Sequence, residues 1–383
     1  MKKLFALLAA LVVVLSSLTA CTSSGSKTIK IGVNLELSGD YLIYGTPEKW
    51  GIQLAVDEIN EAGGILGKQI ELVIYDNKSN ATEAYNNALK LATEDEVVAI
   101  LGAATSGLTV AQQPVASQYE VAIVTPSGSN ALVTVAEDGT VFDWLFRTCF
   151  IDPFQGVVLA NFASTEIGAT KAAVLGATGS DYAVALNEIF STQFTANGGS
   201  VVASESYTDD QTDFSAVLTT LMATDAEVLY VPAYADTAGL IIKQARELGW
   251  NVPIIGPDGF DSASLLTTAG AANLNDVFFS THYTALDENP AVAEFITNYK
   301  ALAGEEPMAL SALGYDAMYL VAQAIEAAGS ADTTKVRDAI LATSDFTGIT
   351  GSITFDEKHN PVKSAVVIEL IDGVYAKATR VNP

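Results

Sequence analysis

From residue 28 onward, short runs of β-branched and aliphatic residues alternate with longer amphipathic stretches, and this alternation is the strongest constraint on the fold. The runs with the composition of buried strands are TIKIGVNLEL, IELVIYD, VVAILGA and VAIVTPS. The segments between them, such as 81–93, have helical periodicity. Strands that alternate with helices need crossover connections, which give a parallel sheet covered on both faces. We therefore predict an α/β fold.

The same rhythm occurs twice along the chain. A second series of strands and helices begins near Asp152 and has a length comparable to the first. With 383 residues, 49% of them hydrophobic, the chain exceeds the size at which one hydrophobic core usually divides. Two similar α/β lobes are expected. Three helical segments near 290–302, 311–328 and 333–343 should follow, and then a C-terminal hairpin turned at Asp372-Gly373.

Two prolines allow local predictions of where helices start or are interrupted. Thr46 and Pro47 have the residue types of an N-cap and a first helical position, and so predict a helix that starts there and ends near residues 63–64. Pro114 lies inside the helical stretch that follows Ser106. Because proline lacks an amide hydrogen, it should kink or shorten that helix.

The first 21 residues have the pattern of an export signal. Lys2 and Lys3 precede an unbroken apolar run, 4–15, which is shorter than the roughly 20 residues that span a bilayer. The sequence Leu18-Thr19-Ala20-Cys21 resembles the bacterial lipobox, which implies removal of residues 1–20 and lipidation of Cys21. The alternative is an ordinary cleavage site beside an incidental cysteine. Residues 21–27 would then form a flexible tether.

Charge and composition exclude several classes of function. Acidic residues outnumber basic ones 45 to 19, which gives a net charge of −26, whereas a nucleic-acid surface needs clustered Lys and Arg. Such a body would be repelled by anionic lipid, so acyl chains alone would hold it at the membrane. Two His and two Cys are too few for a structural zinc site or a disulfide framework. Cys149, in an apolar stretch, is expected to be a buried small hydrophobic residue.

Cofactor and nucleophile motifs are missing from the sequence. It contains no Walker A spacing, no dinucleotide-binding glycine fingerprint and no nucleophile elbow. We therefore expect no metal, no cofactor and no enzymatic activity. A lipoprotein amidase is the least implausible enzyme on such a fold, but the sequence offers no nucleophile with a base beside it.

Hydroxyl groups and a carboxyl group follow the predicted strands, where ligands of open parallel sheets bind. Ser106 lies at the start of a helix, where unpaired amide groups attract an anion, although a serine there can also act only as an N-cap. Ser127 and Ser129 form a second hydroxyl-rich loop at the same edge. In the second series, the predicted strand PIIGPD ends at Asp258. It belongs to an ordinary turn or points a carboxylate into a cleft, where it could pair with a cation.

Several segments occur in an order that resembles the extracytoplasmic solute-binding proteins of branched-chain amino-acid ABC transporters. They are LSGDYLIYG, LGAATSGLTVAQQP, TPSGSN, PAYADTAGLIIKQARELG, GPDG and LGYDAMYLVAQAI. The resemblance covers residue 28 to the C-terminus. It implies the Venus-flytrap fold of type I periplasmic binding proteins, in which two parallel-sheet α/β lobes are joined by a three-crossover hinge. The first lobe would comprise residues 28–150 and 281–355, and the second 151–280 and 356–383.

The resemblance also implies the ligand contacts. They are Tyr44, Ser106, Ser127, Ser129, Tyr182, Tyr234 and Asp258. Ser106 would hold the ligand carboxylate with the backbone at Ser127 and the hydroxyl of Ser129. Asp258 would pair with the ligand ammonium, and the tyrosines would supply a lid and aromatic contacts. Well-studied relatives carry the longer Glu in place of Asp258, so the ammonium would sit differently or reach the carboxylate through water.

The implied function is the capture of a small zwitterionic solute. A branched-chain or other apolar amino acid is expected, bound by a monomer and delivered to an ABC-transporter permease. The protein would be extracytoplasmic and lipid-anchored to the bacterial cell membrane, with no nucleic-acid partner. A sensor lipoprotein of the same fold, which passes closure to a receptor, is the alternative.

Overall fold

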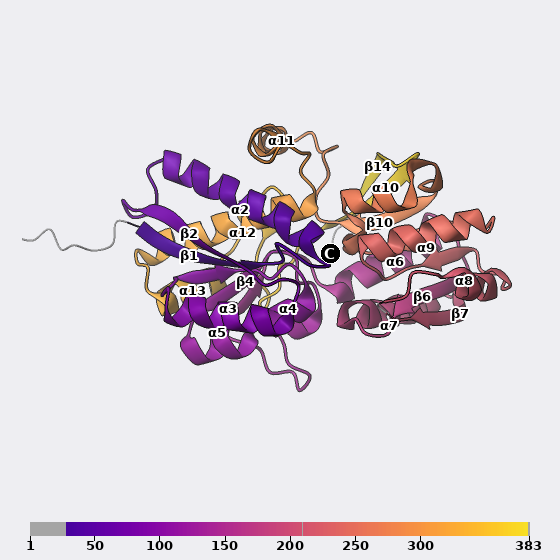
Figure 1. Ribbon diagram of the computed structural model, residues 1–383, viewed down its shortest axis with the longest axis horizontal. Coiled ribbons are helices and arrows are strands. Elements are labelled where there is room, and N and C mark those ends of the chain that lie inside the picture. The colour runs from indigo at the N-terminus through magenta and orange to yellow at the C-terminus, as the bar shows by residue number, and fades with distance from the viewer. Residues whose placement is uncertain (1–27, 209, 382–383) are drawn as a thin grey trace, which may run out of the picture.

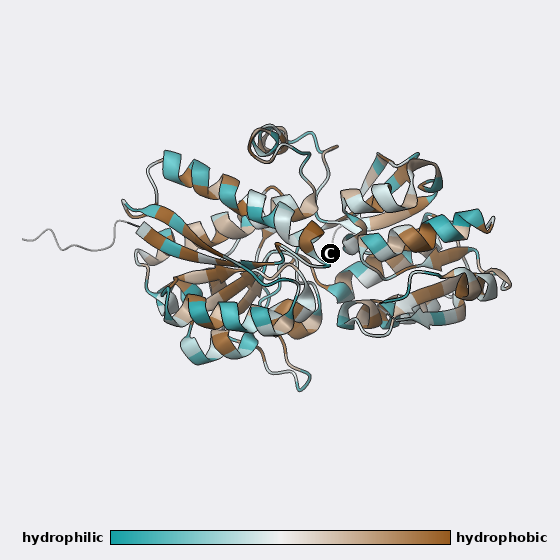
Figure 2. Ribbon diagram, viewed as in Figure 1, coloured by the Kyte–Doolittle hydropathy of each residue, from teal (hydrophilic) through white to brown (hydrophobic). Residues whose placement is uncertain are grey.

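The computed structural model describes residues 28–208 and 210–381. The expected signal segment, the tether and Cys21 lie outside this range. The described chain forms two lobes side by side, each with a central sheet between layers of helices (Figure 1). Apolar residues are concentrated along the central strands, and the outer helices carry the hydrophilic residues (Figure 2). No helix in the described chain has both the length and the apolar character needed to cross a membrane.

The first lobe is built on a sheet that has, in the described chain, five strands in the order β2-β1-β3-β4-β5. These strands are β1 Thr28–Leu35, β2 Gln69–Asp76, β3 Ala99–Leu101, β4 Ala122–Thr125 and β5 Leu145–Arg147. All neighbouring pairs are parallel. Strands β3, β4 and β5 are fully buried, as expected for a parallel sheet covered on both faces.

Helices from two parts of the sequence complete this lobe. They are α2 Leu42–Glu61, α3 Ala81–Thr93, α4 Ser106–Val110, α5 Gln113–Tyr119, α11 Pro290–Ala303, α12 Ala309–Ala328 and α13 Thr333–Leu341. The long helices α2 and α12 pack against each other. A small antiparallel hairpin of β11 Phe346–Gly348 and β12 Gly351–Ile353 follows α13. The apolar core of this lobe therefore combines residues that are far apart in the sequence, such as Ile29 and Ile353.

The second lobe contains, within the described residues, a sheet of seven strands in the order β14-β13-β10-β9-β8-β6-β7. The strands are β6 Lys171–Ala177, β7 Ser200–Tyr207, β8 Val228–Tyr230, β9 Ile254–Gly256, β10 Val277–Thr281, β13 Ala365–Ile371 and β14 Val374–Val381. The helices of this lobe are α6 Asp152–Thr165, α7 Asp181–Ala196, α8 Ser215–Met222, α9 Ala235–Glu247 and α10 Ala263–Ala269. Only β13 and β14 introduce antiparallel pairs into this sheet as described. The hairpin turns at Asp372 and Gly373, as predicted, and both have positive φ.

The described chain passes between the lobes three times, between β5 and α6, between β10 and α11, and between β12 and β13. These segments form the hinge. The predicted α/β architecture of two parallel-sheet lobes is therefore confirmed. Cys149, in the first of these segments, is fully buried, as predicted, and burial raises the pKa of its thiol to about 12.

Local predictions at the prolines had mixed outcomes. The predicted helix start at Thr46 and Pro47 is wrong, because α2 already begins at Leu42 and Pro47 lies inside it. Tyr41, the N-cap of α2, makes no side-chain capping bond, so the sequence carries no local signal for this start. Pro114 does interrupt the helix, as predicted, because α4 ends at Val110 and Pro114 lies in the first turn of α5. Strand β5 was not predicted.

Candidate functional site

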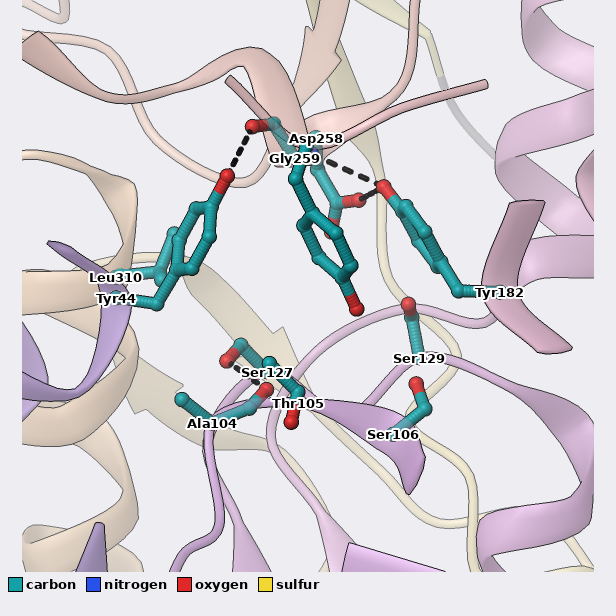
Figure 3. A pocket seen from close by; sticks show the side chains of 11 residues that line it. Tyr44, Ala104, Thr105, Ser106, Ser127, Ser129, Tyr182, Asp258, Gly259 and Leu310 are labelled. Carbon is teal, nitrogen blue, oxygen red and sulfur yellow. Dashed lines mark hydrogen bonds between the residues drawn. The ribbon is translucent and has the colours of Figure 1, made fainter. Parts of the chain in front are cut away.

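A cavity lies between the two lobes, and all of the predicted contact residues line it (Figure 3). Ala104, Thr105, Gly259 and Leu310 complete the lining. We call Ser106, Ser127 and Ser129 the first-lobe wall, and Tyr182, Tyr234 and Asp258 the second-lobe wall. The cavity has a volume of about 30 Å³, which is room for a few water molecules at most. An amino acid would therefore enter only with movement of side chains or of the lobes.

Ser106 has a hydroxyl group that is ready to donate. Its Oγ accepts a hydrogen bond from the backbone N–H of Asn130 at 3.1 Å, which leaves its own proton for a group in the cavity. Because α4 has only five residues, its dipole adds little, and the hydroxyl is the group on which anion binding depends. Ser129 also lines the cavity, and its carbonyl accepts a hydrogen bond from the N–H of Asp152.

Ser127 uses its hydroxyl within the protein. Its Oγ donates to the carbonyl oxygen of Ala104 at 2.7 Å and also contacts the carboxyl group of Glu48. Burial raises the pKa of Glu48 well above its usual value, while the hydrogen bond from Ser127 acts in the opposite direction. A ligand at Ser127 would therefore meet the backbone and not the hydroxyl proton.

Two buried charged residues behind the first-lobe wall fix its loops. The carboxylate of Glu36 accepts hydrogen bonds from Ala104 N at 3.0 Å, Thr105 N at 2.9 Å and Thr105 Oγ1 at 2.8 Å. Arg147 donates to the carbonyl oxygens of Gly128, at 2.7 Å, and Asn130, at 2.9 Å. Burial raises the pKa of Glu36 and lowers that of Arg147, although these hydrogen bonds favour the ionised carboxylate.

Sequence reasoning missed both of these residues. A local signal existed for Glu36, because an acidic residue interrupts the apolar run VNLEL at the end of β1. Such a buried acid needs hydrogen-bond partners. Arg147 is likewise a charged residue beside apolar ones, in the short run LFR. Because no strand was predicted there, its position in the fold could not be inferred.

The second-lobe wall has Asp258 at its centre. Tyr182 Oη donates to Asp258 Oδ1 at 2.6 Å, and Gln155 Nε2 donates to the same oxygen at 3.1 Å. His282 Nε2 donates to Asp258 Oδ2 at 2.9 Å. These donors come from α6, from α7 and from the residue that follows β10, and the carboxylate belongs to a short 3₁₀ turn, Asp258–Phe260. Sequence reasoning found Tyr182 but missed Gln155 and His282, because nothing in the local sequence indicates which distant residue contacts Asp258.

A second buried acid lies next to Asp258. Gln155 Nε2 donates to Asp152 Oδ1 at 2.8 Å as well as to Asp258, so one amide group bridges the two carboxyl groups. Burial and, to a smaller extent, the negative charge of Asp258 together raise the pKa of Asp152 to about 7. The carboxyl group of Asp152 therefore takes up its proton near neutral pH.

The tyrosines join the two lobes. Tyr44 Oη donates to the carbonyl oxygen of Gly259 at 2.8 Å and accepts from Ala235 N at 2.8 Å, so a side chain of α2 is held by the second lobe. The ring of Tyr234 stacks on that of Tyr182, with centroids 5.1 Å apart, and lies 5.3 Å from that of Tyr44. Tyr44 thus contributes its ring to the cavity and its hydroxyl to an inter-lobe contact.

The arrangement offers hydroxyl donors on one side and an oriented carboxylate beneath aromatic rings on the other. It is suited to binding a small dipolar molecule between the lobes. His282 bonds to Asp258, and His359 bonds to the carbonyl oxygen of Leu145. In the described part of the chain neither histidine bonds to a serine hydroxyl, so the geometry gives no support to an amidase.

Comparison with known proteins places this site in context. A family model described as "Periplasmic binding protein" matches residues 28–374. The branched-chain amino acid transporter substrate-binding protein LivJ of Streptococcus pneumoniae, solved in complex with isoleucine, is 38% identical, with a TM-score of 0.88 and coverage of 93% of this chain and 100% of that one. The leucine-binding protein LivK of Thermotoga maritima is 36% identical, with a TM-score of 0.86 and coverage of 93% and 99%. A leucine-, isoleucine-, valine-, threonine- and alanine-binding protein of Pseudomonas aeruginosa is 30% identical over 343 residues, which are 88% of each chain.

Proposed function

The chain belongs to the periplasmic binding proteins, among the solute-binding proteins of branched-chain amino-acid transport, and from this premise we propose that it captures a free apolar amino acid and delivers it to an ABC-transporter permease. The observation that carries the proposal is the pairing of two unlike walls around one cavity. Of the relatives named above, LivJ was solved with isoleucine, LivK is a leucine-binding protein, and the Pseudomonas aeruginosa protein is a leucine-, isoleucine-, valine-, threonine- and alanine-binding protein.

The proposed ligand orientation follows from the polarity of the walls. The ligand carboxylate accepts hydrogen bonds from Ser106, Ser129 and the backbone at Ser127. The ligand ammonium pairs with Asp258, and its side chain packs against Tyr44, Tyr182 and Tyr234. Each hydrogen bond to a charged group contributes about 1.5–3 kcal/mol, so a few of them with apolar packing account for micromolar affinity, about −8 kcal/mol.

Closure couples binding to the hinge. In an open form the two ends of the zwitterion contact one lobe at most, whereas the closed form satisfies both ends, so the ligand shifts the equilibrium toward closure. The inter-lobe hydrogen bonds of Tyr44 add to the stability of the closed form. A solute without an ammonium group leaves the buried carboxylate of Asp258 without a cationic partner and should be rejected.

The remaining parts of the proposal concern location and partners. The family is extracytoplasmic, and the lipobox-like residues 18–21 support an anchor at Cys21. We propose that the two lobes have the limits given above. We also propose that the permease recognises the closed form of the monomer. A receptor in place of a permease would make the protein a sensor with the same ligand.

Calorimetric titration of the purified chain with the natural amino acids tests this function. We expect leucine, isoleucine or valine to bind with a micromolar or lower Kd, and isocaproate, the leucine skeleton without its ammonium, to bind at least about 30-fold more weakly. Chromatography of the titrated sample should show unchanged ligand, because no turnover is expected. Failure of every amino acid to bind, or formation of a product, would contradict the proposal.

A further inference from the structure

A histidine lies directly behind Asp258 and is not among the cavity-lining residues. His282 follows β10 in the second hinge segment, and its side chain is buried, with 2% of the residue exposed. Its Nε2 is 2.9 Å from Asp258 Oδ2, and its ring stacks on Phe150 with centroids 3.6 Å apart. Phe150 belongs to the first hinge segment, so two hinge segments and the 3₁₀ turn fix the position of this ring.

The contacts of His282 favour its neutral form. Nε2 must carry a hydrogen to bond to a carboxylate, whereas Nδ1 is buried and has no hydrogen-bond partner in the described chain. A second proton would create a buried N–H group without an acceptor. Burial lowers the pKa of His282, and the positive charge of Lys363, from the segment before β13, lowers it further, while Asp258 acts in the opposite direction.

Within the described residues, the hydrogen bonds to the side chain of Asp258 come from a tyrosine, a glutamine and a histidine, and none comes from a lysine or an arginine. Tyr182, Gln155 and His282 orient the carboxylate without cancelling its charge. A lysine or arginine in the place of His282 would pair with Asp258 and compete with a ligand cation. A neutral imidazole fixes the same oxygen and leaves the negative charge for the ligand.

We propose that His282 is a positioning residue: as a neutral imidazole it orients Asp258 for the ligand ammonium, and as an imidazolium it cancels the charge of Asp258 and weakens amino-acid binding at acidic pH. This inference rests on the proposed function. It adds a pH-sensitive element to that function, because capture would weaken wherever the medium is acidic enough to protonate a buried imidazole.

Asp152 also titrates in this range, and Lys363, whose pKa burial lowers to about 8, titrates at its upper end. The carboxyl group of Asp152 is joined to Asp258 through Gln155, and its pKa is about 7. Deprotonation of Asp152 above pH 7 adds negative charge and favours a cationic ligand, so it also makes affinity rise with pH. Protonation of His282 affects binding at lower pH, because the pKa of this imidazole lies below its usual value of 6.5. Substituting His282 while keeping Asp152 separates the two effects.

The test compares His282→Leu and His282→Gln with wild type by calorimetric titration with isoleucine between pH 8 and pH 5. His282→Leu removes the donor, and we expect its Kd at pH 7.5 to rise about tenfold. His282→Gln supplies a neutral amide donor and should recover most of that loss. It should also lack the weakening that wild type shows below pH 6.5. His359→Gln, which changes the other histidine, is the matched control and should keep the wild-type pH profile.

Nitrogen NMR of the two histidines in the unliganded chain provides a readout that does not depend on binding. We expect His282 to be the neutral Nε2–H tautomer at pH 7.5, and His359→Gln assigns its signals. An imidazolium or an Nδ1–H tautomer at that pH would overturn the inference, even if His282→Leu fails to fold. So would a His282→Leu variant with wild-type affinity, or a His282→Gln variant with the wild-type acid profile. A wild-type chain that binds no amino acid would overturn the proposed function itself.

Discussion

The first-lobe wall and the second-lobe wall differ in the groups that they present to the cavity and in the groups that support them from behind. The first-lobe wall presents neutral hydroxyl and backbone groups to the cavity and keeps the ionised side chain of Arg147 behind its loop. The second-lobe wall presents a carboxylate itself and keeps neutral donors behind it. In both walls the buried partner fixes geometry, and only the second places a formal charge at the cavity. Discrimination for an ammonium group should therefore reside in the second lobe.

Asp258→Asn tests this asymmetry with the largest expected effect. Removing one partner of a buried charged pair costs about 2–5 kcal/mol, so isoleucine affinity should fall at least about 30-fold. Because the variant no longer buries an unpaired carboxylate, its affinity for isocaproate should not fall and can rise. Calorimetry with both ligands measures the two changes. An equal loss for both ligands would show that Asp258 acts on structure and not on the ammonium.

Ser106→Ala tests the first-lobe wall, with a smaller effect. It removes one hydroxyl donor to the ligand carboxylate, worth about 1.5 kcal/mol, and isoleucine affinity should fall about tenfold. Isocaproate affinity should fall by a similar factor, because both ligands carry a carboxylate. A loss confined to isoleucine would mean that the ligand binds in the reverse orientation.

Tyr44→Phe tests the contact that joins the walls. The variant loses the hydroxyl that bonds to Gly259 and Ala235, which costs about 1 kcal/mol in the closed form, so affinity should fall about fivefold for every amino acid alike. Tyr119→Phe, at a partly exposed tyrosine outside the cavity, is the matched control. A change in the ranking of amino acids would show instead that the Tyr44 hydroxyl contacts the ligand.

Asp236→Asn has the smallest expected effect and the opposite sign. Asp40 of the first lobe and Asp236 of the second line one crevice beside the cavity, and burial, with the charge of Asp40, raises the pKa of Asp236. Like charges on Asp40 and Asp236 repel each other across the closing lobes. Solvent and salt screen such exposed charges, so the variant should bind about twofold more tightly, with the gain reduced in high salt and at a pH low enough to protonate Asp236. Unchanged affinity in low salt would show that this repulsion does not oppose closure.

Local sequence patterns predicted much of the fold. Continuous apolar runs such as VVAILGA and the Asp372-Gly373 turn carry their signals within a few residues, and the structure has β3 and the β13–β14 hairpin at these positions. Strand β5 has three residues, one of them Arg147, and gives no such signal. The start of α2 at Leu42 has no side-chain cap. The helix start was therefore predicted wrongly at Thr46 and Pro47, which have the residue types of an N-cap and a first helical position.

The residues that line the cavity were predictable from the sequence, but the residues that support them from behind were not. Hydroxyls after β3 and β4 and the acid after β9 follow from the rule that loops at the carboxyl ends of strands meet at one edge. The tyrosines came from the family resemblance. Gln155 and His282 contact Asp258 only because α6 and β10 pack beside the same turn, and this depends on the tertiary fold.

A crystal structure of the chain with isoleucine bound tests the central claim most directly. It should show one amino acid between the lobes, with its carboxylate at Ser106 and Ser129 and its ammonium within hydrogen-bond distance of Asp258 or joined to it by one water molecule. An amino acid in the reverse orientation, or one bound away from this cavity, would contradict the account.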